Sequence, residues 1–252
     1  MSLSTIFKRI LKSEIQSKMG ISRTGRPRKL SIDEAINCIF LLVRTGMQWR
    51  ELRPENASYV TVSNTMHTWL RKGIFESAYM KVLQLYRKHH PVKYYCVDST
   101  FIKNVYGTDC IGRSPVDRGR KASKLSVVTD QNGMIHAFHS AKGNVPDVCL
   151  LESTLRSMIG NVDSVELFAD KGYDSKRNRM VCAAVGLKDR ISRKRCKTGK
   201  RQNGKRVVVE NVFAWLDKYR RLILRYEVHI STYEAFTMFA AGNILCNRFL
   251  HL

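Results

Sequence analysis

The sequence predicts two parts, an all-α N-terminal part and an α/β part that has a mixed sheet flanked by helices. Residues 4–89 contain apolar residues at helical spacing, interrupted by Gly and Pro, whereas β-prone runs first appear after Pro91. From there strand and helix patterns alternate, which is typical of a sheet with helices on its faces. We therefore predict a helical domain at residues 1–91 and an α/β domain at residues 92–252.

The charge of the chain predicts a polyanionic partner. Its 252 residues include 44 Lys and Arg against 21 Asp and Glu, a formal net charge of +23. Such an excess favours nucleic acid first and an anionic membrane surface second. A packaging protein would carry the same charge, but an apolar fraction of 44% is that of a globular protein with a core.

The sequence shows no sign of a membrane or a secreted protein. Residues 235–247 form the longest charge-free run near the C-terminus and are too few to span a bilayer, and the N-terminus has no signal-peptide pattern. The seven cysteines are scattered and make no CxxC or CxxH pair, so neither a disulfide framework nor a zinc knuckle is supported. We expect reduced thiols and a cytoplasmic, nucleoid-associated protein.

Four helices are expected in the N-terminal part. Their predicted ranges are residues 4–19, 31–45, 61–70 and 74–89, and Ser31 followed by Glu34 resembles a capping box. Short helices with tight turns and interleaved basic residues fit a helix-turn-helix-like module, with a plain helical bundle as the alternative. If DNA is bound here, Thr61–Lys72 is the candidate recognition helix, with Arg71 and Lys72 on phosphates.

The α/β part is predicted from short β-prone runs separated by turns and helices. The expected strands are residues 93–97 with an extension at 101–105, then 125–129, 134–139 and 165–169. The expected helices are residues 146–159, 175–186 and 206–222. Between the last two helices, Lys188–Arg206 is a strongly basic segment with Asp189 as its one acid. We interpret this segment as one that contacts phosphate, with a solvated charge run as the alternative.

Three acids are the candidate site residues. Asp98 and Asp170 each follow a buried strand, where open α/β sheets place their ligands, and Glu210 lies at the margin of the apolar stripe of the 206–222 helix. Strand-end solvation and helix-surface ion pairs are the alternative interpretations. If the three carboxylates converge, they fit a pair of hard divalent cations that act on phosphodiesters.

Several segments carry a resemblance to a known family. They read VDST at residues 97–100, GRSPVDRGRKASKLSVVTDQNG at 112–133, FADKGYDS at 168–175 and VENVFAWLDKYRRLILRYE at 209–227. Together with the helical stretch at residues 25–52, they resemble the DDE transposases of bacterial insertion sequences, in the compact IS-five-like branch. The resemblance extends from about Gly25 to the end of the chain.

The resemblance implies an RNase H-like catalytic domain that uses two Mg²⁺ ions, for which Mn²⁺ substitutes. Asp98, Asp170 and Glu210 fall on the D, D and E of the family motif, so they are the expected catalytic and metal-binding residues. Members cut double-stranded DNA at the ends of an element and join the 3′-hydroxyl to target DNA, as homodimers on DNA. The expected DNA-binding cations are Arg71, Lys72, Lys171, Arg193, Lys194, Arg195, Arg206, Lys218 and Arg221.

Two departures from the family pattern surround Glu210. Arg206 stands where the Y-x-x-R-x-x-x-E pattern of this branch has its Arg, but Asn203 replaces the Tyr and Asp217 replaces a Lys seven residues after the Glu. Two other functions remain open at this stage. One is a domesticated, non-cutting DNA-binding regulator, and the other is a metal-dependent nuclease without strand transfer.

Overall fold

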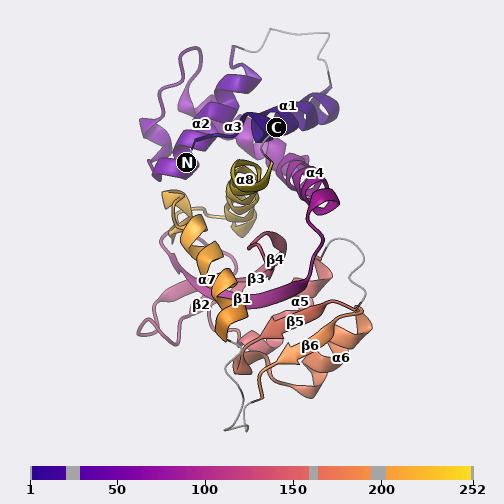
Figure 1. Cartoon of the computed structure of the whole chain (residues 1–252). Helices are drawn as coiled ribbons and strands as arrows, with labels where there is room; N and C mark the ends of the chain where they lie inside the picture. The colour runs from indigo at the N-terminus through magenta and orange to yellow at the C-terminus, as the bar shows by residue number, and fades with distance from the viewer. Residues whose placement is uncertain (1, 21–28, 159–163, 194–202, 251–252) are drawn as a thin grey trace. The chain divides into compact units, whose positions relative to one another are not determined.

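A computed structural model describes residues 2–20, 29–158, 164–193 and 203–250 (Figure 1). The chain divides into two compact units. Unit 1 combines Met1–His89 with Leu216–Leu252, and unit 2 is His90–Trp215. The first boundary lies close to the predicted one at residue 91, while the residues from Leu216 onward group with the N-terminal helices. No helix among the described residues is long and apolar enough to cross a membrane.

Unit 1 is all-α apart from one two-residue strand. Its elements are α1 (Thr5–Met19), α2 (Ile32–Thr45), η1 (Trp49–Glu51), α3 (Tyr59–Arg71), α4 (Ile74–His89), η4 (Arg220–Leu222), β7 (Leu224–Arg225) and α8 (Ile230–Phe249). The four predicted N-terminal helices are thus confirmed to within a few residues. Ser31 caps α2 by accepting a hydrogen bond from the Glu34 backbone N–H, as the capping-box pattern predicts.

The core of unit 1 forms around α8, which lies against α4 and α1. The Phe7 and Phe239 rings meet edge to face at 5.3 Å. Gly242 lets α8 approach α1 closely, because a Cβ at that position would lie 2.4 Å from the Phe7 ring. The charge-free stretch at the C-terminus of the chain is therefore a buried core helix.

Two arginines are buried in unit 1. Arg221 donates from Nε to Glu227 Oε1 at 2.6 Å and from Nη1 to the Met47 carbonyl at 3.0 Å. Arg225 is fully buried and donates to the carbonyls of Glu227 and Val228. These guanidinium groups are satisfied by buried acceptors, so they join the chain segments of this unit.

Unit 2 is built on a mixed sheet. Its strands are β1 (Tyr94–Asn104), β2 (Gly112–Arg113), β3 (Lys121–Asp130), β4 (Ile135–Lys142), β5 (Glu166–Ala169) and β6 (Lys188–Ile191). β3 pairs antiparallel with β1 on one side and with β2 and β4 on the other, while β5 pairs parallel with both β1 and β6. The predicted mixed sheet is confirmed.

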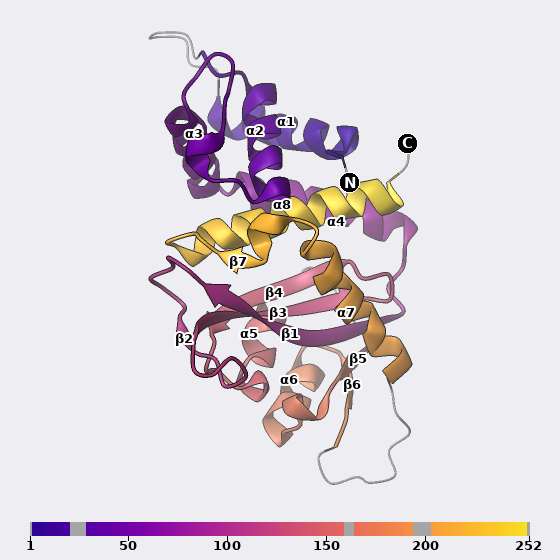
Figure 2. The ribbon, with the colours of Figure 1, turned by 90° about the vertical axis from the view of Figure 1, so that its left-hand side faces the viewer.

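Helices cover both faces of this sheet (Figures 1 and 2). They are η2 (Asp147–Cys149), α5 (Leu151–Arg156), η3 (Lys171–Tyr173), α6 (Lys176–Ala184) and α7 (Asn203–Leu216). One core forms where α5 and α6 pack on the sheet, with Val97, Leu155, Ala169 and Cys182 among its residues. On the other face lies α7, which buries Val209 and Val212 as the helical stripe predicts.

The turn between β3 and β4 receives the carboxyl end of α7. Gly133 has φ +80°, a left-handed conformation that favours glycine. A Cβ there would lie 2.7 Å from the Trp215 ring and 3.0 Å from Val212. Glycine at the predicted hairpin turn therefore allows both the left-handed backbone conformation and the close packing of α7 on the turn.

Three sequence predictions of element bounds were wrong. The helix expected at residues 206–222 ends at Leu216, because Tyr219 takes an extended backbone. The helix expected at residues 146–159 is a short 3-10 turn followed by α5. The basic segment begins as strand β6, because Ile191 is buried and Lys188–Ile191 pairs with β5. Residues 194–202 of that segment lie outside the described residues.

Candidate active site

Alternation along β1 and β5 places two of the predicted acids on one face of the sheet. Side chains of successive strand residues point to opposite faces. Val97 and Ala169 belong to the core under α5 and α6, so Asp98 and Asp170, the residues that follow them, face the side that α7 covers. The two strands are parallel neighbours, with Cys96 opposite Phe168. Both acids therefore lie on the same face of the sheet.

Asp98 forms an ion pair with the first turns of α7. Its Oδ2 accepts a hydrogen bond from Arg206 Nη2 at 3.0 Å, and its Oδ1 accepts one from the Ser99 backbone N–H at 2.8 Å. The side chains of Arg206 and Asp98 are 21% and 23% exposed. Arg206 Nε is buried and has no hydrogen-bond partner in the described structure. The Nε–H of this guanidinium therefore donates no hydrogen bond among the described residues.

The Asp98 carboxyl lies in an environment that disfavours its charge. Burial raises the pKa of Asp98, and the negative charge of Asp170 raises it further. The Ser99 N–H and the Arg206 guanidinium lower the pKa but do not cancel the effect of burial. Two carboxylates that repel each other at a partly buried place favour a bound cation.

Asp170 closes a tight turn at the end of β5. Its Oδ1 accepts a hydrogen bond from the Gly172 N–H at 2.7 Å. A Cβ on Gly172 would lie only 2.8 Å from that oxygen. Because Gly172 has no side chain, its backbone can approach the Asp170 carboxylate closely enough to donate this hydrogen bond.

The amino end of α7 is fixed to the sheet by Lys205. Its ammonium lies over the rings of Phe168 and Tyr94, 4.4 Å and 4.8 Å from their centroids, and its carbonyl accepts a hydrogen bond from Cys96 Sγ. Lys205 precedes Arg206, so these contacts hold Arg206 beside Asp98. The helix thereby brings its basic first turns to the acids.

Comparison with known proteins agrees with this geometry. Residues 93–242 match the family model described as "Transposase DDE domain". The chain belongs to the DDE transposase family. Residues 7–79 also match the model described as "Putative transposase of IS4/5 family". As the resemblance implied, the sheet of this DDE transposase chain is of the RNase H-like class, with antiparallel first strands followed by parallel ones.

Individual proteins that are similar to this chain were also compared with it. The "Putative transposase for insertion sequence element IS402" of Burkholderia cepacia is 32% identical over 143 residues, which are 52% of this chain and 66% of that protein. The chain thus spans just under two thirds of this relative's length. The piggyBac transposase synaptic complex with hairpin DNA gives a TM-score of 0.40 at 13% identity, over 77% of this chain and 48% of that one. The Mos1 mariner paired-end complex with Mn gives 0.30 at 13% identity, over 96% and 84%.

Glu210, which the resemblance predicts as the third acid of the family motif, lies one helical turn after Arg206. Its side chain is exposed, whereas its neighbour Val209 is buried against the sheet. In the part of the chain that the structure describes, no three His, Cys, Asp or Glu side chains are close enough to hold a metal ion together. Asp98 and Asp170 are brought together, and the participation of Glu210 stays a prediction.

The donor atoms at Asp98 and Asp170 fit a hard cation. Carboxylate oxygens suit Mg²⁺ and Mn²⁺, whereas softer metals favour thiolate and imidazole ligands. Cys96 lies two residues before Asp98 on the same strand face, but burial raises the pKa of its thiol to about 12. Because the thiolate is the form that binds metal, this rise makes Cys96 a poorer candidate ligand than the two carboxylates.

The nine predicted DNA-binding cations fall into four groups. Five are exposed and two others, Lys194 and Arg195, lie outside the described residues. Arg206 contacts Asp98. Arg221 is buried against Glu227, which sets it apart from a surface that contacts phosphate. The exposed five are Arg71, Lys72, Lys171, Arg193 and Lys218.

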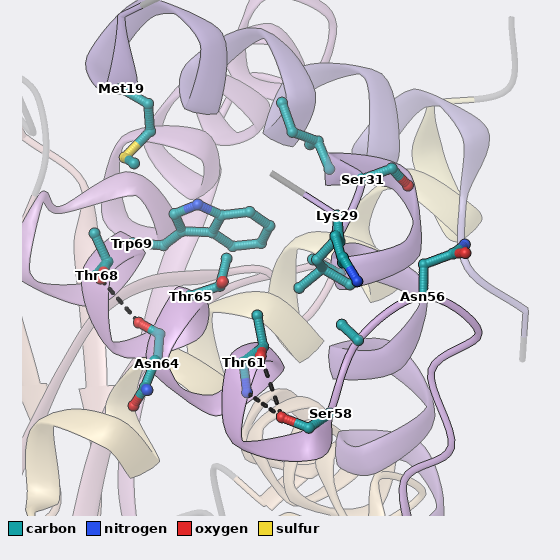
Figure 3. A pocket seen from close by; sticks show the side chains of 14 residues that line it. Met19, Lys29, Ser31, Asn56, Ser58, Thr61, Asn64, Thr65, Thr68 and Trp69 are labelled. Carbon is teal, nitrogen blue, oxygen red and sulfur yellow. Dashed lines mark hydrogen bonds between the residues drawn. The ribbon is translucent and has the colours of Figure 1, made fainter. Parts of the chain in front are cut away.

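A cavity lies beside the candidate recognition helix in unit 1 (Figure 3). It measures about 730 Å³ and lies between α3 and the start of α2. One face of α3 lines it with short polar side chains, and the Trp69 ring and Lys29 also line it. Those polar residues are Thr61, Asn64, Thr65 and Thr68. This face suits hydrogen bonding, and its use in base recognition stays a prediction.

Sequence reasoning missed two residues near the acids. Asp147 was interpreted only as part of a helix start after Pro146, and Lys124, just before the strand predicted at residues 125–129, was assigned no role. Lys124 Nζ lies 3.0 Å from Asp147 Oδ1, and the lysine side chain is 5% exposed. A charged residue within the apolar run of a strand was the signal that could have marked this position.

Proposed function

We propose that this protein is an insertion-sequence transposase that binds the ends of its element, cleaves DNA phosphodiester bonds and transfers the 3′-hydroxyl end to target DNA. The observation that carries the proposal is the pair of acids, Asp98 and Asp170, on the sheet face that α7 covers. Family membership supports the same function.

In this proposal Asp98, Asp170 and Glu210 hold two Mg²⁺ ions, and Mn²⁺ substitutes for them. The bound ions would supply activation of water or a 3′-hydroxyl and stabilisation of the leaving oxygen. Asp98 and Asp170 offer oxygen ligands whose mutual repulsion a cation relieves. Glu210 is exposed on the helix whose first turns reach Asp98, so it completes the site by a shift of α7 when metal and DNA bind.

The net charge of +23 supports double-stranded DNA as the partner. Lys171 is exposed one residue after Asp170, and Arg193 is exposed just beyond β6. We place the scissile phosphate near these cations. Arg71 and Lys72 of α3 contact phosphates elsewhere along the element end, and a homodimer joins two such ends in the nucleoid.

A cleavage and joining assay tests the proposal. The substrate is a labelled duplex carrying an inverted repeat that flanks the gene, with a supercoiled plasmid as target and Mg²⁺ present. Asp98→Asn, Asp170→Asn and Glu210→Gln should each reduce cleavage to below about 1% of wild type while duplex binding in a gel-shift assay is kept. Asp174→Asn is the matched control, because Asp174 pairs with Arg179 at 2.7 Å and is not a proposed ligand.

Each alternative gives its own result. Binding without cleavage by the wild-type protein would favour the non-cutting regulator. Cleavage without joining to the plasmid would favour a nuclease. Near-normal cleavage by any of the three acid variants would remove that residue from the site.

A further inference from the structure

We infer that the loop between β1 and β3 is a further DNA-contacting element of unit 2, and that it meets the duplex about five base pairs from the scissile phosphate. Residues 105–121, which include β2 and the first residue of β3, are here called the β1–β3 loop. The inference rests on the proposed function, because it adds a contact to the same substrate. None of the cations in this loop is among the nine that the sequence predicts to bind DNA.

Four exposed cations lie in the β1–β3 loop. Their side chains make no hydrogen bond or ion pair with any other described residue. Asp117, the acid that lies among them in the sequence, is instead 3.9 Å from Lys103 Nζ of β1. The loop therefore keeps a net positive charge. The four cations are Arg113, Arg118, Arg120 and Lys121.

Several other exposed arginines of unit 2 have acid partners. Arg156 and Arg177 both pair with Glu152. Arg190 pairs with Glu166. Cations without neighbouring acids create a stronger positive potential, and phosphate contacts release the counterions of DNA. The β1–β3 loop therefore suits contact with a DNA backbone better than those paired arginines do.

Hydrogen bonds within the loop fix the turn that carries two of the cations. The Ser114 N–H donates to the Arg120 carbonyl at 2.8 Å, and the Gly119 N–H donates to the Ser114 carbonyl at 3.1 Å. Arg118 has φ +48° and Gly119 has φ +72°. A residue other than glycine is uncommon in this left-handed region, and such residues cluster at sites that contact ligands.

The base of the loop is attached to the rest of the sheet. Ser123 Oγ of β3 donates to the Cys110 carbonyl at 2.8 Å. Gly112 packs closely on the turn after β4, because a Cβ there would lie 2.8 Å from the Asn144 backbone nitrogen. A loop that is already ordered loses little conformational entropy when its cations meet phosphate.

The pairing of β1 with β3 gives the distance from the loop to the acids. Asp98 is opposite Val127, and Lys103 is opposite Ala122, which follows Lys121. Five residues of strand, from Asp98 to Lys103, span roughly 17 Å. That length equals about five base pairs of a duplex that runs along β1. One duplex can therefore contact the acids and the loop together.

A solvated group of charges is the alternative explanation of the loop. In that case the removal of two charges would weaken DNA binding only through the net charge of the protein, wherever the charges lie. Arg118→Gln with Arg120→Gln removes two charges from the loop. Lys188→Gln with Arg190→Gln is the matched control, because both residues are exposed on β6, at the opposite edge of the sheet from β2.

The first test is a gel-shift titration of the full chain at several salt concentrations, on a duplex that carries an inverted repeat flanking the gene. The loop variant should bind about tenfold more weakly and reduce the slope of log affinity against log salt by about two. Its Tm should equal that of wild type. Arg118→Lys with Arg120→Lys keeps the charge and should retain most of the slope.

The second test neutralises the phosphates instead of the protein. Methylphosphonate linkages are placed about four to six base pairs from the scissile phosphate, on each side of it in separate duplexes. On one side they should weaken wild-type binding but cause little further loss in the loop variant, because the same contacts are already gone. Linkages about twelve base pairs away should cause equal losses in both proteins.

Each outcome separates this inference from the proposed function. If the loop variant loses no more affinity than the β6 control, the loop acts only through net charge, and the inference is overturned while the proposed function stands. Losses from the loop variant and the near linkages that add fully would also overturn it. If the wild-type protein binds no duplex, the proposed function itself fails.

Discussion

The two units each contain an arginine–carboxylate pair, and the pairs differ in how completely they are enclosed. In unit 1, Arg221 and Glu227 are 7% and 2% exposed, and Arg221 also donates to a backbone carbonyl. In unit 2, Arg206 and Asp98 are 21% and 23% exposed, and Arg206 Nε has no partner among the described residues. Glu227 Oε2 also has no partner there, so the pairs differ mainly in exposure. In the proposed function the first pair is a structural contact, whereas a ligand can replace the second.

This difference shows why an ion pair alone does not mark a functional site. A fully desolvated pair is costly to break, because the remaining charge stays buried without compensation. A partly solvated pair costs little to separate, so a metal ion or a phosphate can compete for either partner. Breaking the Arg221–Glu227 pair should therefore lower mainly stability, whereas breaking the Arg206–Asp98 pair should change mainly ligand binding.

The largest effect is expected from breaking the enclosed pair. Arg221→Met should lower the free energy of unfolding by about 3–5 kcal/mol, because it leaves Glu227 buried and uncompensated. Chemical denaturation measures this loss. Arg221→Met combined with Glu227→Leu should regain most of it, and failure of the double variant to do so would show that the arginine acts by packing alone.

The loss in Arg221→Met should also depend on pH. Burial raises the pKa of Glu227 in the folded protein, and Arg221 opposes that rise. Without Arg221 the folded-state pKa rises further above the unfolded value of about 4.3, so folding favours the protonated acid. The difference in stability between the variant and wild type should be small near pH 4 and grow as the pH rises through the folded-state pKa. A difference that does not change with pH would contradict this account.

A smaller effect on stability, with a gain in metal binding, is expected at the open pair. Arg206→Gln should change the free energy of unfolding by about 1 kcal/mol or less. Without DNA, it should tighten Mn²⁺ binding about fivefold, because the guanidinium no longer competes for Asp98 Oδ2. DNA cleavage should fall nevertheless, since Arg206 then cannot contact phosphate. Unchanged or weaker Mn²⁺ binding would make Arg206 a structural residue like Arg221.

The smallest effect is expected at an exposed pair. Lys12 and Asp33 lie 2.5 Å apart and are 42% and 44% exposed. Hydrogen bonds from Lys12 and then Lys8 lower the pKa of Asp33, so the contribution to stability is present above the unfolded Asp pKa and is lost as the pH falls through the folded one. Lys12→Gln should cost less than about 1 kcal/mol at low salt and nothing measurable at 1 M salt. A loss that persists at high salt would point to packing of the lysine stem.

Local patterns in the sequence predicted the helices, the strands and the sheet face of the two acids, because these depend on residues that are close in the chain. The N-terminal helices follow from apolar spacing and from the Ser31 cap, and the strands follow from β-prone runs between turns. The positions of Asp98 and Asp170 on the sheet face that α7 covers follow from strand alternation once the core residues are known.

Contacts between distant segments could not be predicted in this way. Arg206 and Asp98 are 108 positions apart, and Asp147 meets Ser99 across 48 positions. No periodicity encodes such pairs, because the fold brings them together. Strand β6 was missed because its residues alternate in burial while carrying the charges of a loop. The grouping of α8 with the N-terminal helices likewise rests on packing at long range.

The seating of α7 restricts how Glu210 can move. Lys205 and Arg206 hold the amino end of the helix on the sheet, and Trp215 holds the carboxyl end over the turn at Gly133. Glu210 lies on the helix between these two contacts. In the proposed function, a shift of α7 that carries Glu210 toward the acids also moves Arg206, because the two residues are four positions apart on the same helix face.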